Sequence, residues 1–307
     1  MVMIGIVAGI GMAGFDRIEP GRSSLQASVE NFIESSRDRA RASNQKVVVS
    51  LQASTEEAAA RWQRMVFRSV FEASFESAAQ ARENVQLEGQ AAVQVAGRYG
   101  AGLDLREGGV GVVNGRGTPD LSEGFALDFD CFPTDVESGK LLTWPGIVSI
   151  EQRRDGVVAC QVRAGDGDFF TNITLETQVG ALQANRWQHL RLFAADSVCK
   201  LQIDGKVVAT ADLPIYLSSP QDVPVFGDID SPWLGKIDEF YVQSRQVELG
   251  PQVPDDVQMM PSQQLIMFNR FGALDDSHIE DVVVLVESFG EALATFVIGR
   301  FSQEVTE

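Results

Sequence analysis

Cysteine and histidine are scarce in this sequence of 307 residues, which has 3 cysteines and 2 histidines. The cysteines, Cys131, Cys160 and Cys199, form no CxxC pair, which argues against a zinc cage. Each lies in an apolar, strand-like stretch, so we expect buried thiols. The histidines, His189 and His278, are far apart in the sequence and offer little for a histidine-based metal or nucleophilic site.

Basic residues are also in short supply. The 25 lysines and arginines compare with 43 aspartates and glutamates, which gives a formal net charge of -18. Nucleic-acid affinity comes mainly from cations that neutralise phosphates, so we expect no nucleic-acid partner. The same charge disfavours binding to anionic lipid headgroups and favours solubility.

Two phosphate-binding motifs are missing. No Gly-x-x-x-x-Gly-Lys-Ser/Thr loop occurs, and the glycine-rich stretch Gly108 to Gly111 lacks the flanking parallel strand and helix of a dinucleotide site. With 44% hydrophobic residues, the chain can nevertheless form a real core, in one large domain or two ordinary ones.

The N-terminal 44 residues contain two contrasting stretches. Met1 to Gly14 is apolar and uncharged, but it is shorter than the roughly 20 residues that span a bilayer. It also lacks the layout of a secretory signal peptide. Pro20-Gly21 interrupts the helix, and Ser23 or Ser24 caps a second, amphipathic one that ends at Asn44. Its apolar stripe consists of Leu25, Val29, Phe32, Ile33 and Ser36.

The amphipathic helix ends in RDRARASN and is followed by a β-branched strand, Lys46 to Leu51. Together they resemble the minor pseudopilins of the type II secretion system and their type IV pilin relatives. The resemblance implies a helix anchored in the bacterial inner membrane, packed on an antiparallel sheet and assembled with other pilin-like subunits. The family's prepilin-peptidase site, Gly followed by Phe-Thr-Leu-x-Glu, is absent. We therefore expect Met1 to be an internal or misassigned start, with that site upstream.

The middle of the chain changes from mixed to strand-rich. Thr55 to Arg64 predicts a short helix or an irregular excursion, Met65 to Phe75 a strand, and Glu76 to Glu88 a loop. From Val93 onward, short alternating stretches separated by glycines are typical of an all-β sandwich. The expected strands are Gly102 to Leu105, Val110 to Val113, Phe125 to Phe132, Gly146 to Gln152, Val157 to Ala164, Asn172 to Glu176, Trp187 to Ala194, Ser197 to Ile203, Lys206 to Leu213 and Leu234 to Gln243.

Five blocks of this region follow one another in a characteristic order. They are Gly97 to Leu105 (GRYGAGLDL), Phe125 to Phe132, Asn185 to Leu192 (NRWQHLRL), Leu201 to Lys206 (LQIDGK) and Gly235 to Val242 (GKIDEFYV). Their order and spacing resemble the laminin-G-like, concanavalin A-like jelly roll. The resemblance implies an antiparallel β-sandwich that binds carbohydrate or protein.

Three further strands are expected near the C-terminus, in Gln264 to Gly272, Val282 to Glu287 and Ala294 to Arg300. They resemble the closing strands of the pseudopilins. The predicted fold is therefore mainly β with a long N-terminal α-helix, in which a pilin-like α+β domain is split by an inserted jelly roll. The expected parts are the helix (1–44), the first pilin-like strands (45–90), the jelly roll (93–245) and the closing strands (250–307).

Carboxylates are the main candidates for chemistry in a sandwich of this kind. Asp128 and Asp130 share a strand face, but the Glu-x-Asp-x-x-Glu pattern of endoglucanases is absent. Asp238 and Glu239 are adjacent, so we expect them on opposite faces. We therefore expect no catalytic residue and no enzymatic activity, with glycoside hydrolysis through Asp128 or Asp130 as an alternative.

Asp228, Asp230 and Asp238 are candidate calcium ligands near one end of the sandwich, although no EF-hand spacing occurs. No other cofactor is indicated. Trp233 follows Pro232 in an expected loop, where its ring would stack on a sugar or pack at the rim. Trp187 and His189 share a strand face, and we expect Trp187 in the core.

The sequence thus predicts a non-enzymatic, pseudopilin-like filament component that displays a carbohydrate-binding or protein-binding jelly roll. Leu25, Val29, Phe32 and Ile33 would join the helix to its own sheet. The expected location is the inner membrane, with the folded part in the periplasm or at the cell surface. A membrane-stalked adhesion protein unrelated to secretion remains an alternative.

Overall fold

The computed structural model describes residues 20–299, except 44–45, 54–58, 74, 76, 95, 115–117, 167–168, 215, 276 and 290. The chain divides into two compact units. One, here called the terminal unit, consists of Met1–Val66 and Gln246–Glu307; the other, the sandwich unit, is Phe67–Arg245. The expected membrane stretch, Met1 to Gly14, lies outside the described residues. Within the described part of the chain, no helix combines the length and apolar character needed to cross a bilayer.

The sandwich unit contains two antiparallel sheets. The strands of the first are β2 (Arg61–Ala73) from Phe67 on, β4 (Ala92–Gln94), β5 (Gly102–Asp104), β7 (Phe125–Pro133), β12 (Gln188–Ala195), β13 (Val198–Ile203), β14 (Lys206–Asp212) and the first part of β16 (Gly235–Gln252). Their order is β14-β13-β12-β7-β16-β2, with β5 paired to β16 and β4 to β5.

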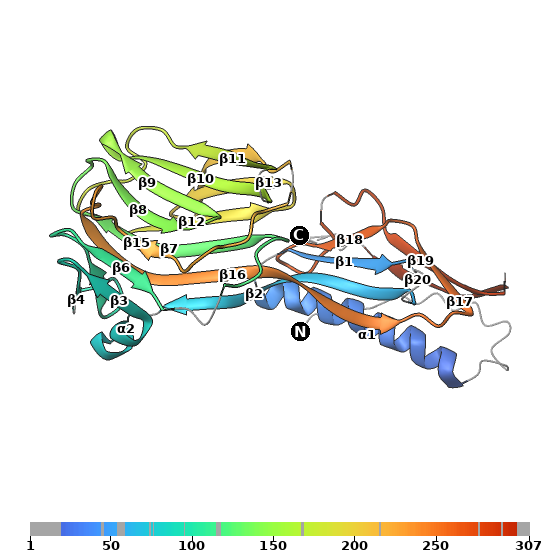
Figure 1. Cartoon of the computed structure of the whole chain (residues 1–307). Coiled ribbons are helices and arrows are strands. Elements are labelled where there is room, and N and C mark those ends of the chain that lie inside the picture. The colour runs from blue at the N-terminus through green and yellow to red at the C-terminus, as the bar shows by residue number, and fades with distance from the viewer. Residues whose placement is uncertain are drawn as a thin grey trace, which may run out of the picture. The chain divides into compact units, whose positions relative to one another are not determined.

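The second sheet is formed by β3 (Val85–Glu88), β6 (Val110–Val113), β8 (Gly139–Trp144), β9 (Val148–Arg153), β10 (Val157–Asp166), β11 (Phe169–Glu176) and β15 (Val225–Phe226). Its order is β11-β10-β9-β8-β15-β6-β3. The two sheets form the two layers of the unit in Figure 1 and share one apolar core. Three rings from both sheets meet there, since Phe226 lies 5.6 Å from Phe129 and 5.0 Å from Phe240, measured between centroids.

Each strand expected between Gly102 and Gln243 is present, which confirms an antiparallel β-sandwich. β8 and β15 were not expected. The three cysteines are buried free thiols. Burial raises the pKa of the Cys131 and Cys160 thiols.

The stretch Glu76 to Glu88 is not the loop that we expected. It contains a short helix, α2 (Ala78–Asn84), and β3. The Ser77 hydroxyl accepts the backbone N–H of Gln80 at 3.2 Å and so caps α2, a signal that the polar composition concealed. Residues from Phe67 to Glu88 also belong to the sandwich unit rather than to the first pilin-like strands, because Phe71 and Phe75 lie in the sandwich core.

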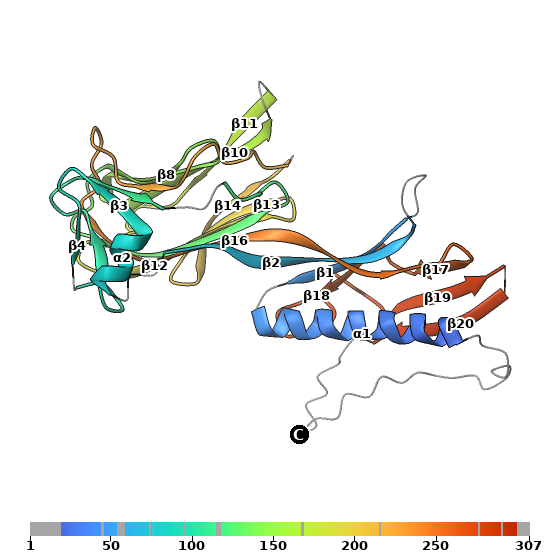
Figure 2. The same cartoon turned by 60° about the horizontal axis from the view of Figure 1, so that its bottom comes forward.

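The terminal unit combines strands from both ends of the chain with one long helix. Its elements are α1 (Pro20–Ser43), β1 (Val47–Gln52), β2 (Arg61–Ala73) up to Val66, the end of β16 from Gln246, β17 (Val257–Pro261), β18 (Leu265–Phe268), β19 (Val282–Ser288) and β20 (Glu291–Ile298). β1 lies between β2 and β18, and β19 lies between β17 and β20. Figure 2 shows α1 running along these strands.

Apolar contacts join α1 to these strands. Val29 and Ile33 are 0% and 3% exposed and share a core with Val49 and Phe268, and Leu25 and Phe32 pack against that core. Because the helix periodicity brings these four positions to one side, the predicted stripe is the buried side of the helix.

Two boundaries in this unit differ from expectation. α1 begins at Pro20 rather than at a serine cap, because a proline in the first helical turn loses no intrahelical hydrogen bond. The expected excursion from Thr55 to Arg64 ends earlier, since β2 begins at Arg61. β17 was not expected.

Candidate functional site

The outer face of the first sheet carries a dense group of charged side chains. In β7, Leu127, Phe129 and Cys131 point into the core, so alternation sends Asp128 and Asp130 to the other face. The neighbouring strand β12 pairs Arg191 with Asp128 and His189 with Asp130. The register therefore places two cations directly opposite two carboxylates.

His189 bridges the two aspartates. Its Nδ1 lies 3.1 Å from Oδ1 of Asp130, and its Nε2 lies 3.3 Å from Oδ1 of Asp128. These hydrogen bonds, to Asp128 and then to Asp130, raise the pKa of His189 to about 9, although burial acts in the opposite direction. At neutral pH the ring is thus a cation that donates from both nitrogens.

Two arginines complete the charged group. Arg98 Nη1 donates to Asp130 at 2.6 Å, and Arg191 Nη1 lies 3.5 Å from Asp128. Each aspartate therefore contacts His189 and one guanidinium. Charge-assisted hydrogen bonds of this kind hold the side chains in defined positions.

Asp238 holds the loop that carries Arg98. Its carboxylate is fully buried and accepts the backbone N–H groups of Arg98 and Tyr99 at 2.7 and 2.9 Å and that of Glu239 at 3.0 Å. Burial raises the pKa of Asp238 above its ordinary value, and these three N–H donors act against that shift. The loop from Arg98 to Tyr99 is therefore fixed to β16 by a buried acceptor.

A β-bulge brings one more acid to this face. Along β16, Asp238 pairs with Asp130 and Tyr241 pairs with Asp128. The chain therefore advances by three residues on β16 where it advances by two on β7, which is a β-bulge. Glu239, at the bulge, has a φ of 51°. We expected Asp238 and Glu239 on opposite faces. That expectation was wrong, because the bulge interrupts the alternation and turns Glu239 to the outer side as well. There the Glu239 carboxylate accepts a hydrogen bond from the Tyr241 hydroxyl.

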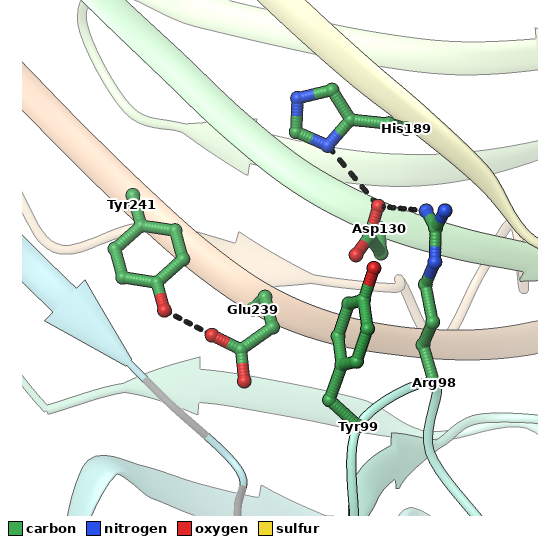
Figure 3. A pocket seen from close by; sticks show the side chains of 6 residues that line it. All are labelled: Arg98, Tyr99, Asp130, His189, Glu239 and Tyr241. Carbon is green, nitrogen blue, oxygen red and sulfur yellow. Dashed lines mark hydrogen bonds and ion pairs between the residues drawn. The ribbon is translucent and has the colours of Figure 1, made fainter. Parts of the chain in front are cut away.

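An open pocket of about 500 Å³ lies on this face of the sheet. It is lined by Arg98, Tyr99, Asp130, His189, Glu239 and Tyr241. Figure 3 shows Arg98 and Tyr99 rising together from their loop, with the Glu239–Tyr241 pair to one side and His189 beyond Asp130. Tyr99 is 58% exposed, and the Arg98 guanidinium lies 5.4 Å from the centroid of its ring. The pocket thus combines fixed charges with one accessible aromatic face.

The expected calcium ligands do not form one site. Asp228 accepts hydrogen bonds from Lys140 Nζ, at 2.8 Å, and from the backbone N–H groups of Asp230 and Ser231. Asp238 is occupied by its hydrogen bonds to the Arg98 loop. Asp230 is exposed. Within the part of the chain that the structure describes, no three His, Cys, Asp or Glu residues are grouped so as to hold a metal ion.

Of the two tryptophans, Trp233 lies in the sandwich core and Trp187 does not. Trp233 is 2% exposed, and its indole donates to Gln152 Oε1 at 3.0 Å, so it offers no face to a sugar. Trp187, which we expected in the core, is only half-buried and contacts the Phe132 ring. The loop position of Trp233 and the strand position of Trp187 were misleading, because neither indicates what packs above the ring.

Arg98, Tyr99, Glu239 and Tyr241 were not predicted as site residues. Arg98 and Tyr99 lie in the glycine-rich stretch from Gly97, whose sequence indicates a jelly-roll strand and not a binding residue. The pairing of β5 with β16 would have indicated Arg98 and Tyr99, because it places the loop that precedes β5 beside β16.

No protein-family model and no curated protein matches the chain. Among solved structures, the chain is similar to the binding domain of Paraclostridial Mosquitocidal Protein 1, with 13% identity and a TM-score of 0.44, over 57% of this chain and 48% of that one. The chain thus spans about half the length of that structure.

Two further similar structures were solved with sugars. One is domain 4 of AbnA, a GH43 extracellular arabinanase from Geobacillus stearothermophilus, in complex with arabinotriose; identity is 13%, the TM-score 0.42, and coverage 61% of this chain and 95% of that one. The other is the CBM40 of Ruminococcus gnavus IT-sialidase bound to α2,3-sialyllactose, with 18% identity, a TM-score of 0.32, and coverage of 44% and 80%. Since these scores are below 0.5, a functional argument has to come from the residues of this chain.

Proposed function

We propose that the sandwich unit binds carbohydrate without transforming it. The observation that supports this proposal is the composition of the pocket over β7, β12 and β16. Sugar hydroxyls both donate and accept hydrogen bonds, and the pocket offers carboxylate acceptors, guanidinium donors and tyrosine hydroxyls that do both. The exposed Tyr99 ring adds an apolar face for the C–H groups of a sugar ring.

The expected ligand is neutral rather than acidic. Arg98 and His189, the cations of the pocket, are already paired with Asp130, and Glu239 adds a further acid. The chain as a whole carries a formal charge of -18. An anionic glycan would meet repulsion that these paired cations do not offset.

A non-enzymatic role suits the same contacts. The residues that line the pocket include no serine, threonine or cysteine as a nucleophile. His189 is held as a cation between two carboxylates, which removes it as a general base at neutral pH. Asp128 and Asp130 both accept from cations, an arrangement that suits two fixed carboxylates better than the acid and nucleophile of a glycosidase.

A glycan array with the full chain tests this proposal. We expect neutral glycans to be retained, and the Tyr99→Ala and Asp130→Asn variants to lose that retention. Asp230→Asn is the matched control, because Asp230 is an exposed acid outside the pocket. Equal retention by all four proteins, or retention of acidic glycans alone, would contradict the proposal. Release of reducing sugar from a retained glycan would instead favour glycoside hydrolysis.

For the terminal unit we propose the pilin-like role that its sequence resembles. The observation that supports it is the packing of Val29 and Ile33 of α1 against β1 and β18, strands from the two ends of the chain. In this proposal the unit assembles with other pilin-like subunits at the bacterial inner membrane and presents the sandwich unit in the periplasm or at the cell surface.

Cross-linking in cells tests the pilin-like role. A cysteine at the exposed position Asn31 of α1 should give membrane-associated, disulfide-linked oligomers after mild oxidation. The same substitution at Asp230 should give none. A protein that is membrane-associated but stays monomeric would favour the alternative of a membrane-stalked adhesion protein unrelated to secretion. A protein outside the membrane fraction would contradict both.

A further inference from the structure

An aromatic row lies next to the charged pocket on the same sheet face. Phe132 is two residues beyond Asp130 in β7, and Trp187 is two residues before His189. The Phe132 and Trp187 ring centroids are 5.4 Å apart, with the planes tilted by 54°. Both side chains are half-buried, so each keeps part of its surface accessible.

Lys236 connects this row with the pocket. It pairs with Phe132 across β16 and β7, and its Nζ lies 5.8 Å from the Phe132 ring centroid. The same Nζ donates to the backbone carbonyl of Ala96 at 3.1 Å, just before the loop of Arg98 and Tyr99. Pocket and aromatic row are thus parts of one surface.

We propose that Phe132 and Trp187 form a second sugar subsite, so that the site binds a linear neutral oligosaccharide rather than a single sugar. This inference rests on the proposed carbohydrate function of the pocket. Two residues along a strand span about 6.6–6.8 Å, a step comparable to the length of one sugar residue in a chain. One ring in the pocket therefore places the next ring over the aromatic row.

The environment of Trp187 suits a ligand contact better than a packing role. The indole N–H of Trp187 makes no hydrogen bond to any described residue. The indole N–H of the buried Trp233, in contrast, donates to Gln152 Oε1. A half-exposed indole offers an apolar face and one donor, which match the C–H groups and hydroxyls of a sugar.

Calorimetric titration of the full chain tests the subsite. The probes are gluco-, manno-, galacto- and xylo-oligosaccharides, from mono- to hexasaccharide. We expect the wild-type affinity for at least one series to rise by roughly tenfold from mono- to disaccharide or trisaccharide. Trp187→Ala should abolish that gain and leave monosaccharide binding unchanged, and Trp187→Phe should retain most of the gain.

Phe169→Ala is the matched control, since it removes an aromatic ring that is 90% exposed on the other sheet. If Trp187→Ala does not fold, as judged by circular dichroism, Phe132→Leu makes the same test. A length-dependent gain that survives these substitutions overturns the subsite and leaves the proposed function standing. A wild-type protein that binds no member of any series overturns both.

Discussion

His189 lies directly opposite Asp130 in the pairing of β12 with β7, and its Nδ1 is 3.1 Å from the Asp130 carboxylate. The same ring reaches Asp128 through Nε2. One side chain therefore links two carboxylates that face outward from the same strand, and Arg98 joins them through Asp130. The charges of the pocket hold one another in place before any ligand arrives, which lowers the ordering cost of binding.

The first prediction concerns pH. The pKa of His189 is raised from 6.5 to about 9 in the folded protein. The stabilisation that follows is fully present below pH 6.5 and is lost as the pH rises toward 9. Because the His189 side chain is 41% exposed, solvent screening limits the effect to about 1 kcal/mol. Urea denaturation of the wild type and His189→Gln across this range should show their difference shrink with rising pH. A difference that is constant across the range would contradict the assignment.

The second prediction concerns Asp238. Replacing it by alanine leaves the backbone N–H groups of Arg98 and Tyr99 without their acceptor. We expect a loss of about 2–3 kcal/mol in the free energy of unfolding, together with weaker glycan binding because the loop is no longer fixed. Asp230→Ala, at an exposed position, should change stability by less than about 0.5 kcal/mol. Equal unfolding curves for the two variants would show that the buried acceptor is not needed.

The third prediction separates Trp233 from the ligand site. Trp233→Phe removes the indole donor to Gln152 in the core. The unpaired Gln152 oxygen should cost about 1–3 kcal/mol of stability, measured by thermal or urea unfolding. Glycan retention at a temperature where the variant is folded should equal that of the wild type. If retention falls while the fold is intact, Trp233 has a part in binding after all.

The fourth prediction concerns the packing of α1. Ile33→Ala removes a side chain that is 3% exposed in the core of the terminal unit. We expect a loss of about 2–5 kcal/mol. Asn31→Ala, on the exposed side of the same helix, is the control and should stay within about 0.5 kcal/mol of the wild type. Two indistinguishable variants would mean that α1 does not depend on this contact.

Much of the fold was predictable because it depends on local periodicity. Alternating residues in β7 and β12 predict strands with one apolar side, and the spacing of Val29 and Ile33 predicts the buried side of a helix. The strands β8 and β15 were missed for lack of a clear alternation, and α2 was missed because its cap, Ser77, lies in a polar stretch typical of loops.

The candidate site was less predictable, for a physical reason. Strand alternation indicates that Asp128 and Asp130 share a face, but only the pairing of β7 with β12 and β16 brings His189 and Tyr241 beside them. A residue's neighbours across a sheet come from distant parts of the chain, so the sequence around each residue does not indicate them.

The amino-acid sequence by itself determined the strands, the buried face of α1 and the outward direction of Asp128 and Asp130, since these follow from periods of two and 3.6 residues along one element. The tertiary structure alone decided the bulge at Glu239, the fixed Arg98 loop, the burial of Trp233 and the partial exposure of Trp187. These features depend on strand register and on what covers each side chain, which only the assembled sheets define.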